Sequence, residues 1–186
     1  MASSQKKVLV RRIAGDVLAG YLPLSGFVRH RALDLLDLSG RVIQLTLNDI
    51  KLISYVRDFN LNDTQNPERL TRRTFLARPR TEGLWLRLTF RQQERNAAPD
   101  ILEGLAPIDL ALADDLVNDA GLFLTPPDIR GNTQRLFVPR TSIADLQLLA
   151  VITSPSKKKP QPVAPDDATL QQDLFNADLP PNARPN

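Results

Sequence analysis

Two segments of the chain share one pattern, and this pattern constrains the fold more than any other feature of the sequence. Leu18-Ala19-Gly20-Tyr21-Leu22-Pro23-Leu24 and Leu102-Glu103-Gly104-Leu105-Ala106-Pro107-Ile108 both read Leu-x-Gly-x-x-Pro-apolar. Each segment follows an alternating strand and precedes a strand, a polar turn, another strand and a closing apolar segment, in the same order. We interpret this agreement as an internal repeat. The alternative is a chance recurrence of a short Gly/Pro pattern.

Alternating polar and apolar residues predict strands around each motif. The predicted strands cover residues 8–13, 32–36 and 42–47 in the first half, and residues 84–90, 121–125 and 134–138 in the second. The closing segments, 49–56 and 142–152, place apolar residues first three and then two positions apart. That spacing predicts a short turn that leads into a last strand.

The shared glycine and proline indicate how each unit bends. Gly20 and Gly104 lie one strand into their units, where a strongly bent strand needs a residue without Cβ. Pro23 and Pro107 cannot donate to a strand ladder, so each marks the place where its strand leaves the sheet. We therefore predict a mainly β protein with two tandem small β-barrels of the SH3 or Sm-like kind.

Four regions follow from this reading. The expected regions are a first barrel over 6–57, an Arg-rich connection over 58–82, a second barrel over 83–153, and a tail over 154–186. Seven of the 33 tail residues are proline and large apolar side chains are sparse, which predicts disorder. The alternative is a short helix within 168–175 that forms on contact with a partner.

Composition excludes several chemistries. The chain has no cysteine and a single histidine, His30, so thiol catalysis, disulfides and zinc fingers have no support. It has no phosphate-binding glycine loop and no nucleophile elbow. Ser25, His30 and Asp34 crowd one predicted loop, where an exposed histidine is the simpler interpretation. The spacing of Asp114, Asp115 and Asp119 lacks the glycine of a calcium loop.

We therefore expect no catalytic residues, no cofactor and no metal, and hence no enzyme. No apolar run reaches the roughly 18 residues of a membrane span, and no signal peptide is visible, so we expect a cytoplasmic protein without membrane contact. The aromatic residues are also expected to serve packing rather than base stacking, with Trp85 buried. They are Tyr55, Phe59, Trp85 and Phe90.

An arginine cluster lies in the connection. Residues 69–80 hold five arginines and no acidic residue: Arg69, Arg72, Arg73, Arg78 and Arg80. Arginine binds phosphates and carboxylates with two parallel hydrogen bonds, so the cluster is a candidate anion-binding site. Residues 1–80 carry 14 Lys/Arg against 7 Asp/Glu and residues 81–153 carry 6 against 10. A solvated connection that pairs with the acidic second half is therefore the alternative.

Three families resemble parts of the sequence. The spacing Arg69-x-x-x-Arg73 resembles the arginine motif of PilZ domains, which bind cyclic di-GMP, although their Asp/Asn-x-Ser-x-x-Gly string does not follow. Gly15-Asp16-Val17-Leu18-Ala19-Gly20 resembles the start of the Sm-like fold, whose RNA-contacting Ile-Arg-Gly is replaced here by Leu47-Asn48-Asp49-Ile50.

The closest resemblance covers residues 6–152. It is carried by Val56-Arg57-Asp58-Phe59, Glu82-Gly83-Leu84-Trp85, and the two strings 123–128 and 134–140. On these residues the chain is similar to an uncharacterised bacterial domain-of-unknown-function family. The resemblance implies a bacterial source and no activity.

These observations favour a non-enzymatic interaction or scaffold module with a protein partner. The alternative is a binder of an anionic ligand, either RNA or a cyclic dinucleotide, through the arginine cluster. The oligomeric state is left open.

Overall fold

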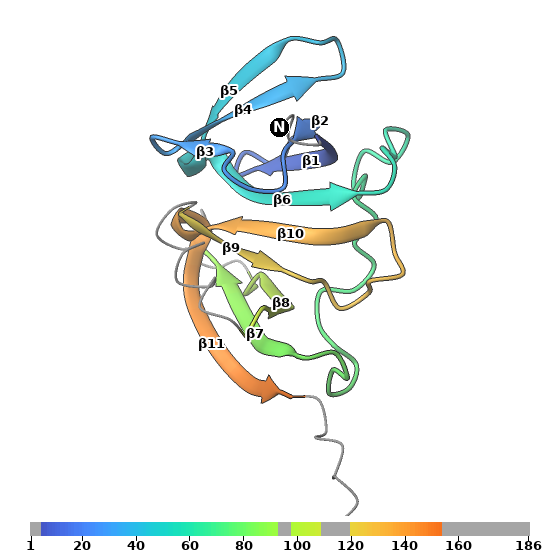
Figure 1. Cartoon of the computed structure of the whole chain (residues 1–186), viewed down its shortest axis with the longest axis vertical. Coiled ribbons are helices and arrows are strands. Elements are labelled where there is room, and N and C mark those ends of the chain that lie inside the picture. Colours follow the sequence, from blue (N-terminus) through green and yellow to red (C-terminus); the bar gives the residue numbers. More distant parts are fainter. Residues whose placement is uncertain (1–4, 93–97, 109–119, 154–186) are drawn as a thin grey trace, which may run out of the picture. The chain divides into compact units, whose positions relative to one another are not determined.

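The computed structural model describes residues 5–92, 98–108 and 120–153, and the regular secondary structure within them is almost entirely β-strand (Figure 1). The predicted tail, and Asp114, Asp115 and Asp119, lie outside the described residues. The first half contains β1 (Lys6–Arg12), β2 (Val17–Leu22), β3 (Val28–Arg29), β4 (Ala32–Asp37), β5 (Val42–Thr46), a 3-10 helix η1 (Leu47–Asp49) and β6 (Ile50–Val56). The second half contains β7 (Gly83–Phe90), β8 (Ile101–Ala106), β9 (Gly121–Leu124), β10 (Thr133–Pro139), a 3-10 helix η2 (Arg140–Ser142) and β11 (Ile143–Ile152).

The closing apolar segments are therefore strands. Each is preceded by one turn of 3-10 helix, η1 before β6 and η2 before β11. The expectation of a short turn before a last strand is confirmed in both halves. Among the described residues, no helix is long and apolar enough to cross a membrane.

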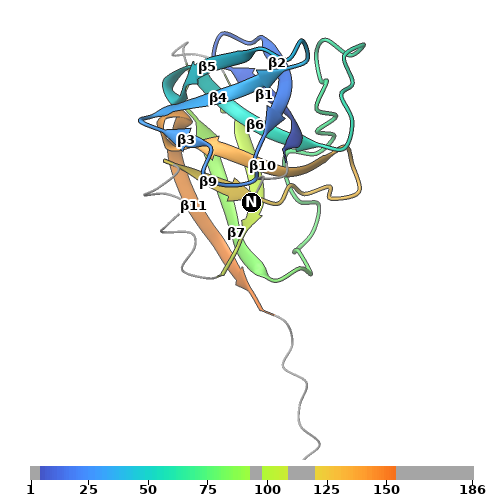
Figure 2. The same ribbon diagram turned by 45° about the horizontal axis from the view of Figure 1, so that its top comes forward.

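The strands form two antiparallel sheets. The larger sheet has the order β3-β4-β2-β1-β6-β10-β9, with β5 paired to β4, and the smaller has the order β11-β7-β8. An isolated bridge between Leu105 and Thr125 connects the smaller sheet to the end of β9. Figure 2 shows β6 and β10 side by side, where the larger sheet passes from the first half of the chain into the second.

The prediction of two separate closed barrels is not confirmed, because neither sheet closes on itself. The reason lies in the partner of β6. This strand pairs with β1 on one side and with β10 of the other half on the other side, so it does not close on β5. Within the described residues β11 pairs only with β7.

Two hydrophobic clusters fill the interior. At the β6–β10 pairing, strands of each half contribute side chains to the cluster of the other half. Successive residues of a strand point to opposite faces. Ile53 of β6 therefore joins the first cluster, whereas its neighbour Leu52 joins the second. In return, Phe123 of β9 and Phe137 of β10 pack into the first cluster. Each half is thus completed by residues of the other.

The two motif glycines lie where a neighbouring strand approaches closely. Gly20 is in β2, and a Cβ there would stand 2.5 Å from the carbonyl oxygen of Leu36. Gly104 is in β8, and a Cβ there would stand 2.8 Å from Cβ of Leu124. Each strand ends at the residue before its motif proline, β2 before Pro23 and β8 before Pro107.

Alanine at either glycine should destabilise the protein. We expect Gly20→Ala to lower the free energy of unfolding by more than the roughly 1 kcal/mol of a glycine propensity effect, because the methyl group meets a backbone carbonyl that cannot rotate away. Ala19→Val in the same strand is the control and should cost less. Urea unfolding curves measure both, and equal losses for the two variants would contradict the packing argument.

Candidate functional site

The Arg-rich connection, which begins after β6 and ends before β7, is anchored to the first half by Glu68. This residue is 4% exposed, and its carboxylate accepts two hydrogen bonds from Arg11 of β1. The Nε–Oε1 distance is 2.7 Å and the Nη2–Oε2 distance is 2.8 Å. Thr133 of β10 donates its hydroxyl to the Glu68 carbonyl oxygen at 2.7 Å. The hydrogen bond to Glu68 raises the pKa of Arg11 against the opposing effect of desolvation.

A second buried carboxylate, Glu103 of β8, anchors the connection to the second half. Glu103 is 2% exposed. It accepts hydrogen bonds from the Phe75 backbone N–H, the Trp85 indole N–H and the Arg87 guanidinium. Its own backbone N–H donates to the carbonyl oxygen of Arg73 at 2.7 Å. Burial raises the pKa of Glu103, but these hydrogen bonds outweigh it and leave the pKa lowered.

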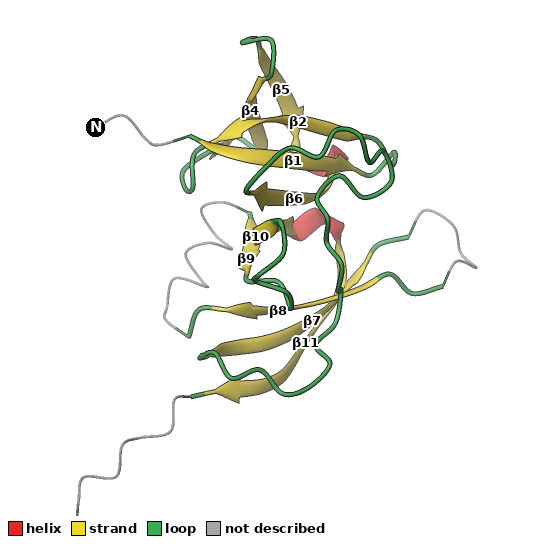
Figure 3. Ribbon diagram, turned by 90° about the vertical axis from the view of Figure 1, so that its right-hand side faces the viewer, coloured by secondary structure: helices red, strands yellow, loops and turns green. Residues whose placement is uncertain are grey.

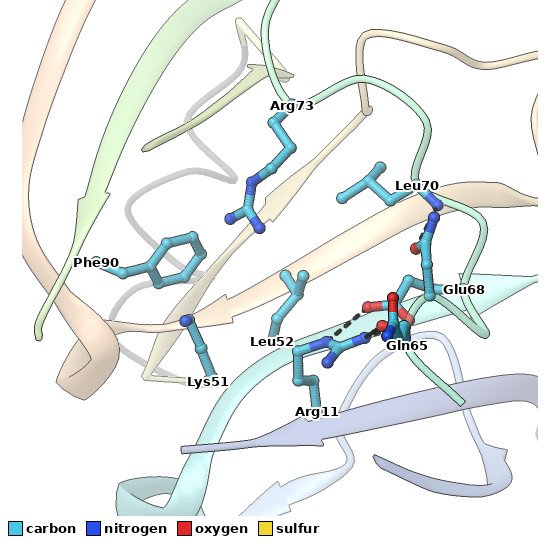
Figure 4. Close-up of a pocket in the computed structure, with 9 residues that line it drawn as sticks. Arg11, Lys51, Leu52, Gln65, Glu68, Leu70, Arg73 and Phe90 are labelled. Carbon is cyan, nitrogen blue, oxygen red and sulfur yellow. Dashed lines mark hydrogen bonds and ion pairs between the residues drawn. The ribbon is translucent and has the colours of Figure 1, made fainter. Parts of the chain in front are cut away.

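A cavity of about 320 Å³ lies between the first half, the connection and β7 (Figure 4). Its lining residues are Arg11, Lys51, Leu52, Gln65, Asn66, Glu68, Leu70, Arg73 and Phe90. Lys51 reaches this cavity from the mostly apolar β6 because the pairing with β1 is irregular there: Arg11 pairs with Leu52 and Arg12 with Ile50. Lys51 is the extra residue of a β-bulge, which redirects its side chain.

The charges of the cavity are largely paired. The carboxylate of Asp100 forms ion pairs with Lys51 Nζ and Arg73 Nη2, each at a distance of 2.6 Å. The same two cations lie 5.4 and 5.7 Å from the ring centroid of Phe90. With Arg11 and Glu68 included, the three basic groups exceed the two acidic groups by one positive charge. The cavity therefore suits a small anion that competes with Asp100 for Lys51 and Arg73.

The described lining of the cavity lacks serine, threonine, cysteine and histidine. It therefore carries no hydroxyl, thiol or imidazole group. Among residues 5–92, 98–108 and 120–153 no group of three or more His, Cys, Asp or Glu side chains is placed to hold a metal ion. This arrangement can bind a ligand through charge and shape, and its two groups that could act as nucleophiles, the Lys51 amine and the Glu68 carboxylate, are both held in ion pairs.

The structure brings one of the five predicted arginines to the cavity. Arg73 lines it, and Arg69 turns away and donates to Asn60 Oδ1 at 2.9 Å. Arg72, Arg78 and Arg80 are exposed, and no hydrogen bond or ion pair within the described part of the chain involves them. Sequence reasoning missed the two other cations of the cavity, Arg11 and Lys51. Only the interruption of an apolar strand by a lysine signalled Lys51.

The remaining candidates are dispersed. Ser25, His30 and Asp34 are all exposed, and no hydrogen bond within the described ranges links them.

The four aromatic candidates divide between the interior and the surface. Tyr55 and Phe90 are buried, as expected of packing residues. Phe59 and Trp85 are half-buried, so the prediction of a buried Trp85 is wrong. Trp85 points to the outer face of β7, where Phe75 of the connection packs on it edge-on at 5.7 Å. Strand alternation places Leu86, not Trp85, in the second cluster.

A second candidate surface is the free edge of β11. This strand has ten residues and pairs with β7 alone among the described residues. It leaves Leu146, Leu148 and Val151 exposed at 44, 57 and 46%. At the other end of the first half, β5 also has a single described neighbour, β4, and exposes Val42 at 67%.

A family model described as a family of unknown function, DUF6982, matches residues 4–150. The chain belongs to this family. The match spans every described strand of the chain except for the last two residues of β11. No curated protein and no solved structure matches the chain.

The lowered pKa of Glu103 makes a testable contribution to stability. The charged carboxylate stabilises the fold at pH values above 4.5, the usual pKa of an unfolded glutamate, and this stabilisation is lost as the pH falls through the lower folded pKa. We expect Glu103→Gln to lower the melting temperature at pH 7. The difference in melting temperature between this variant and the wild type should become smaller as the pH falls below 4.5. Thermal unfolding followed by Trp85 fluorescence measures both, and a difference that is independent of pH would contradict the assignment.

Proposed function

We propose that this chain is a non-enzymatic interaction module built from two copies of one small β unit, and that it binds protein partners at its free strand edges. The order of elements supports the repeat. In each half two strands are followed by two more, then a 3-10 helix and a last strand. The two-residue β3 is the only described strand of the first half that stands outside this order.

The strand registers support the same proposal. Val8 of β1 pairs with one motif glycine, and Leu86 of β7 pairs with the other. On their opposite sides, Val8 pairs with Tyr55 of β6 and Leu86 pairs with Leu148 of β11. Both last strands also carry a β-bulge at their second residue, because the register skips one residue after Ile50 and one after Ile143. Agreement in register and bulge is hard to obtain by chance.

The edge of β11 is the observation that carries the interaction proposal. A long edge strand without lysine or proline exposes main-chain N–H and C=O groups that can pair with another strand. Main-chain hydrogen bonds supply affinity in such complexes, and alternate side chains supply specificity. Leu146 and Leu148 are two positions apart, so they stand on one face of the strand and form an apolar contact site.

Site-specific photo-crosslinking in the source cells tests this proposal. A benzophenone side chain in place of Leu148 should give a covalent adduct with one protein partner. The same group in place of Leu76, which is 79% exposed in the connection, is the matched control and should give none. Equal adducts at both positions, or no adduct at position 148, would contradict binding at the β11 edge.

A second candidate function, anion binding, is favoured by the two cations of the cavity, Lys51 and Arg73, that flank Asp100. A phosphate or carboxylate ligand would take the place of Asp100 between Lys51 and Arg73. A cyclic dinucleotide would use this cavity, whereas RNA would use the exposed Arg72, Arg78 and Arg80 as well.

Two arginine variants separate these ligands. Arg73→Ala should abolish retention on immobilised cyclic di-GMP, and Arg78→Ala should leave it unchanged. Binding to single-stranded RNA should weaken with both variants and fall steeply with salt. Melting temperatures of both variants control for folding, since Arg73 also donates to the carbonyl oxygen of Ile101. Wild-type protein that binds neither ligand at low salt would exclude this second function.

A further inference from the structure

We infer that the strand which pairs with β11 is β5 of a second copy of this chain, so that copies associate head to tail. This inference rests on the proposed function, because it names the occupant of the β11 edge. It follows from a strand pairing that the chain already makes within itself.

The internal pairing between β6 and β10 provides the template. It places Arg135 opposite Tyr55, Leu136 opposite Ser54 and Phe137 opposite Ile53. In terms of the repeat, β10 precedes the 3-10 helix of the second unit and β6 follows the 3-10 helix of the first. One unit thus offers the strand before its helix to the strand after the helix of the other.

At the outer ends, the same two kinds of strand each have only one neighbour among the described residues. β5 precedes η1 in the first unit, and β11 follows η2 in the second. Figures 1 and 3 show β5 and β11 at opposite ends of the two-unit body. Repeating the movement that relates the first unit to the second would therefore bring β5 of a new copy onto β11. β11 has bulges at Ala144 and Leu149, which lie on either side of residues 145–148 and leave that stretch regular. The bulge at Lys51, which corresponds to the one at Ala144, does not prevent β6 from pairing.

The register of this new pairing can be derived. The 3-10 helices begin at Leu47 and Arg140, so residues 42–56 correspond to residues 135–149. The internal pairs then predict Val42 opposite Leu148, and Gln44 opposite Leu146. Val42 is 67% exposed and Leu148 is 57% exposed, and each is the most exposed large apolar side chain of its strand. The template brings these two side chains together, where they would cover each other.

The association between copies should be weaker than the internal joint, by which we mean the pairing of β6 with β10. In the internal joint, Phe137 of β10 is fully buried in the core of the first unit. Its counterpart in β5 is the exposed Gln44, which adds little apolar area. We therefore expect a reversible association that depends on concentration. A head-to-tail contact uses two different surfaces, so it yields rings or filaments rather than a symmetric dimer.

Sedimentation velocity of the full chain tests the inference. The wild type should show a mass that rises with concentration. Val42→Lys and Leu148→Lys should each weaken association at least tenfold, because each places a charge at the predicted contact. An equimolar mixture of the two variants should form a 1:1 dimer and nothing larger, because one intact β5 meets one intact β11. A mixture that stays monomeric, or single variants that assemble like the wild type, would overturn the head-to-tail contact.

A gain-of-function variant keeps the test decisive if the wild type associates weakly. Gln44→Phe restores the aromatic residue of the internal joint and should strengthen association at least tenfold. Gln147→Phe on the opposite face of the contact is the matched control and should not. Wild type and Gln44→Phe that both remain monomeric at millimolar concentration would overturn the inference.

The crosslinking result separates this inference from the function on which it rests. An adduct of position 148 with another copy of the chain supports both. An adduct with a different protein, from a chain that is monomeric when purified, overturns self-association and leaves the interaction module in place. The absence of any adduct at position 148 overturns both.

Discussion

The pairing of β6 with β10 is the interaction on which the rest of the structure depends. It merges the two halves into one sheet and lets each half complete the core of the other. Phe123 and Phe137 fill the first core, and Leu52 reaches into the second. Neither half closes as an independent barrel, because the strand that would close the first half is committed to the second. Among the described residues, the outer strands β5 and β11 are left with one neighbour each.

Two buried carboxylates hold the connection in place around this joint. Glu68 forms an ion pair with Arg11 of the first half, and Glu103 of the second half accepts a hydrogen bond from the backbone N–H of Phe75. Removing one partner of a buried ion pair leaves an unpaired charge, which costs about 3–5 kcal/mol. The connection therefore forms one wall of a cavity with fixed geometry. Its arginines differ in role, since Arg73 faces that cavity and Arg78 faces solvent.

The strands and the short turns could be predicted from the sequence, because alternation and the spacing of Gly20 and Gly104 are local properties. The joint between the halves could not. The run Ile50–Val56 indicates a strand buried on both faces, but the partner of such a strand is not encoded locally. Residues 143–152 have a similar apolar run, yet they form an exposed edge. The cavity was missed because a bulge, not a motif, directs Lys51 into it.

Hydrogen exchange at several protein concentrations tests most directly the central claim, which is that the edge strands β11 and β5 pair with a strand of another molecule. Amides of β6 and β10 should be strongly protected at every concentration, because both strands pair on two sides. In β11 and β5, amides that exchange rapidly in dilute solution should become protected as the concentration rises. Protection that does not change in these two strands, or that rises in other strands instead, would contradict the claim.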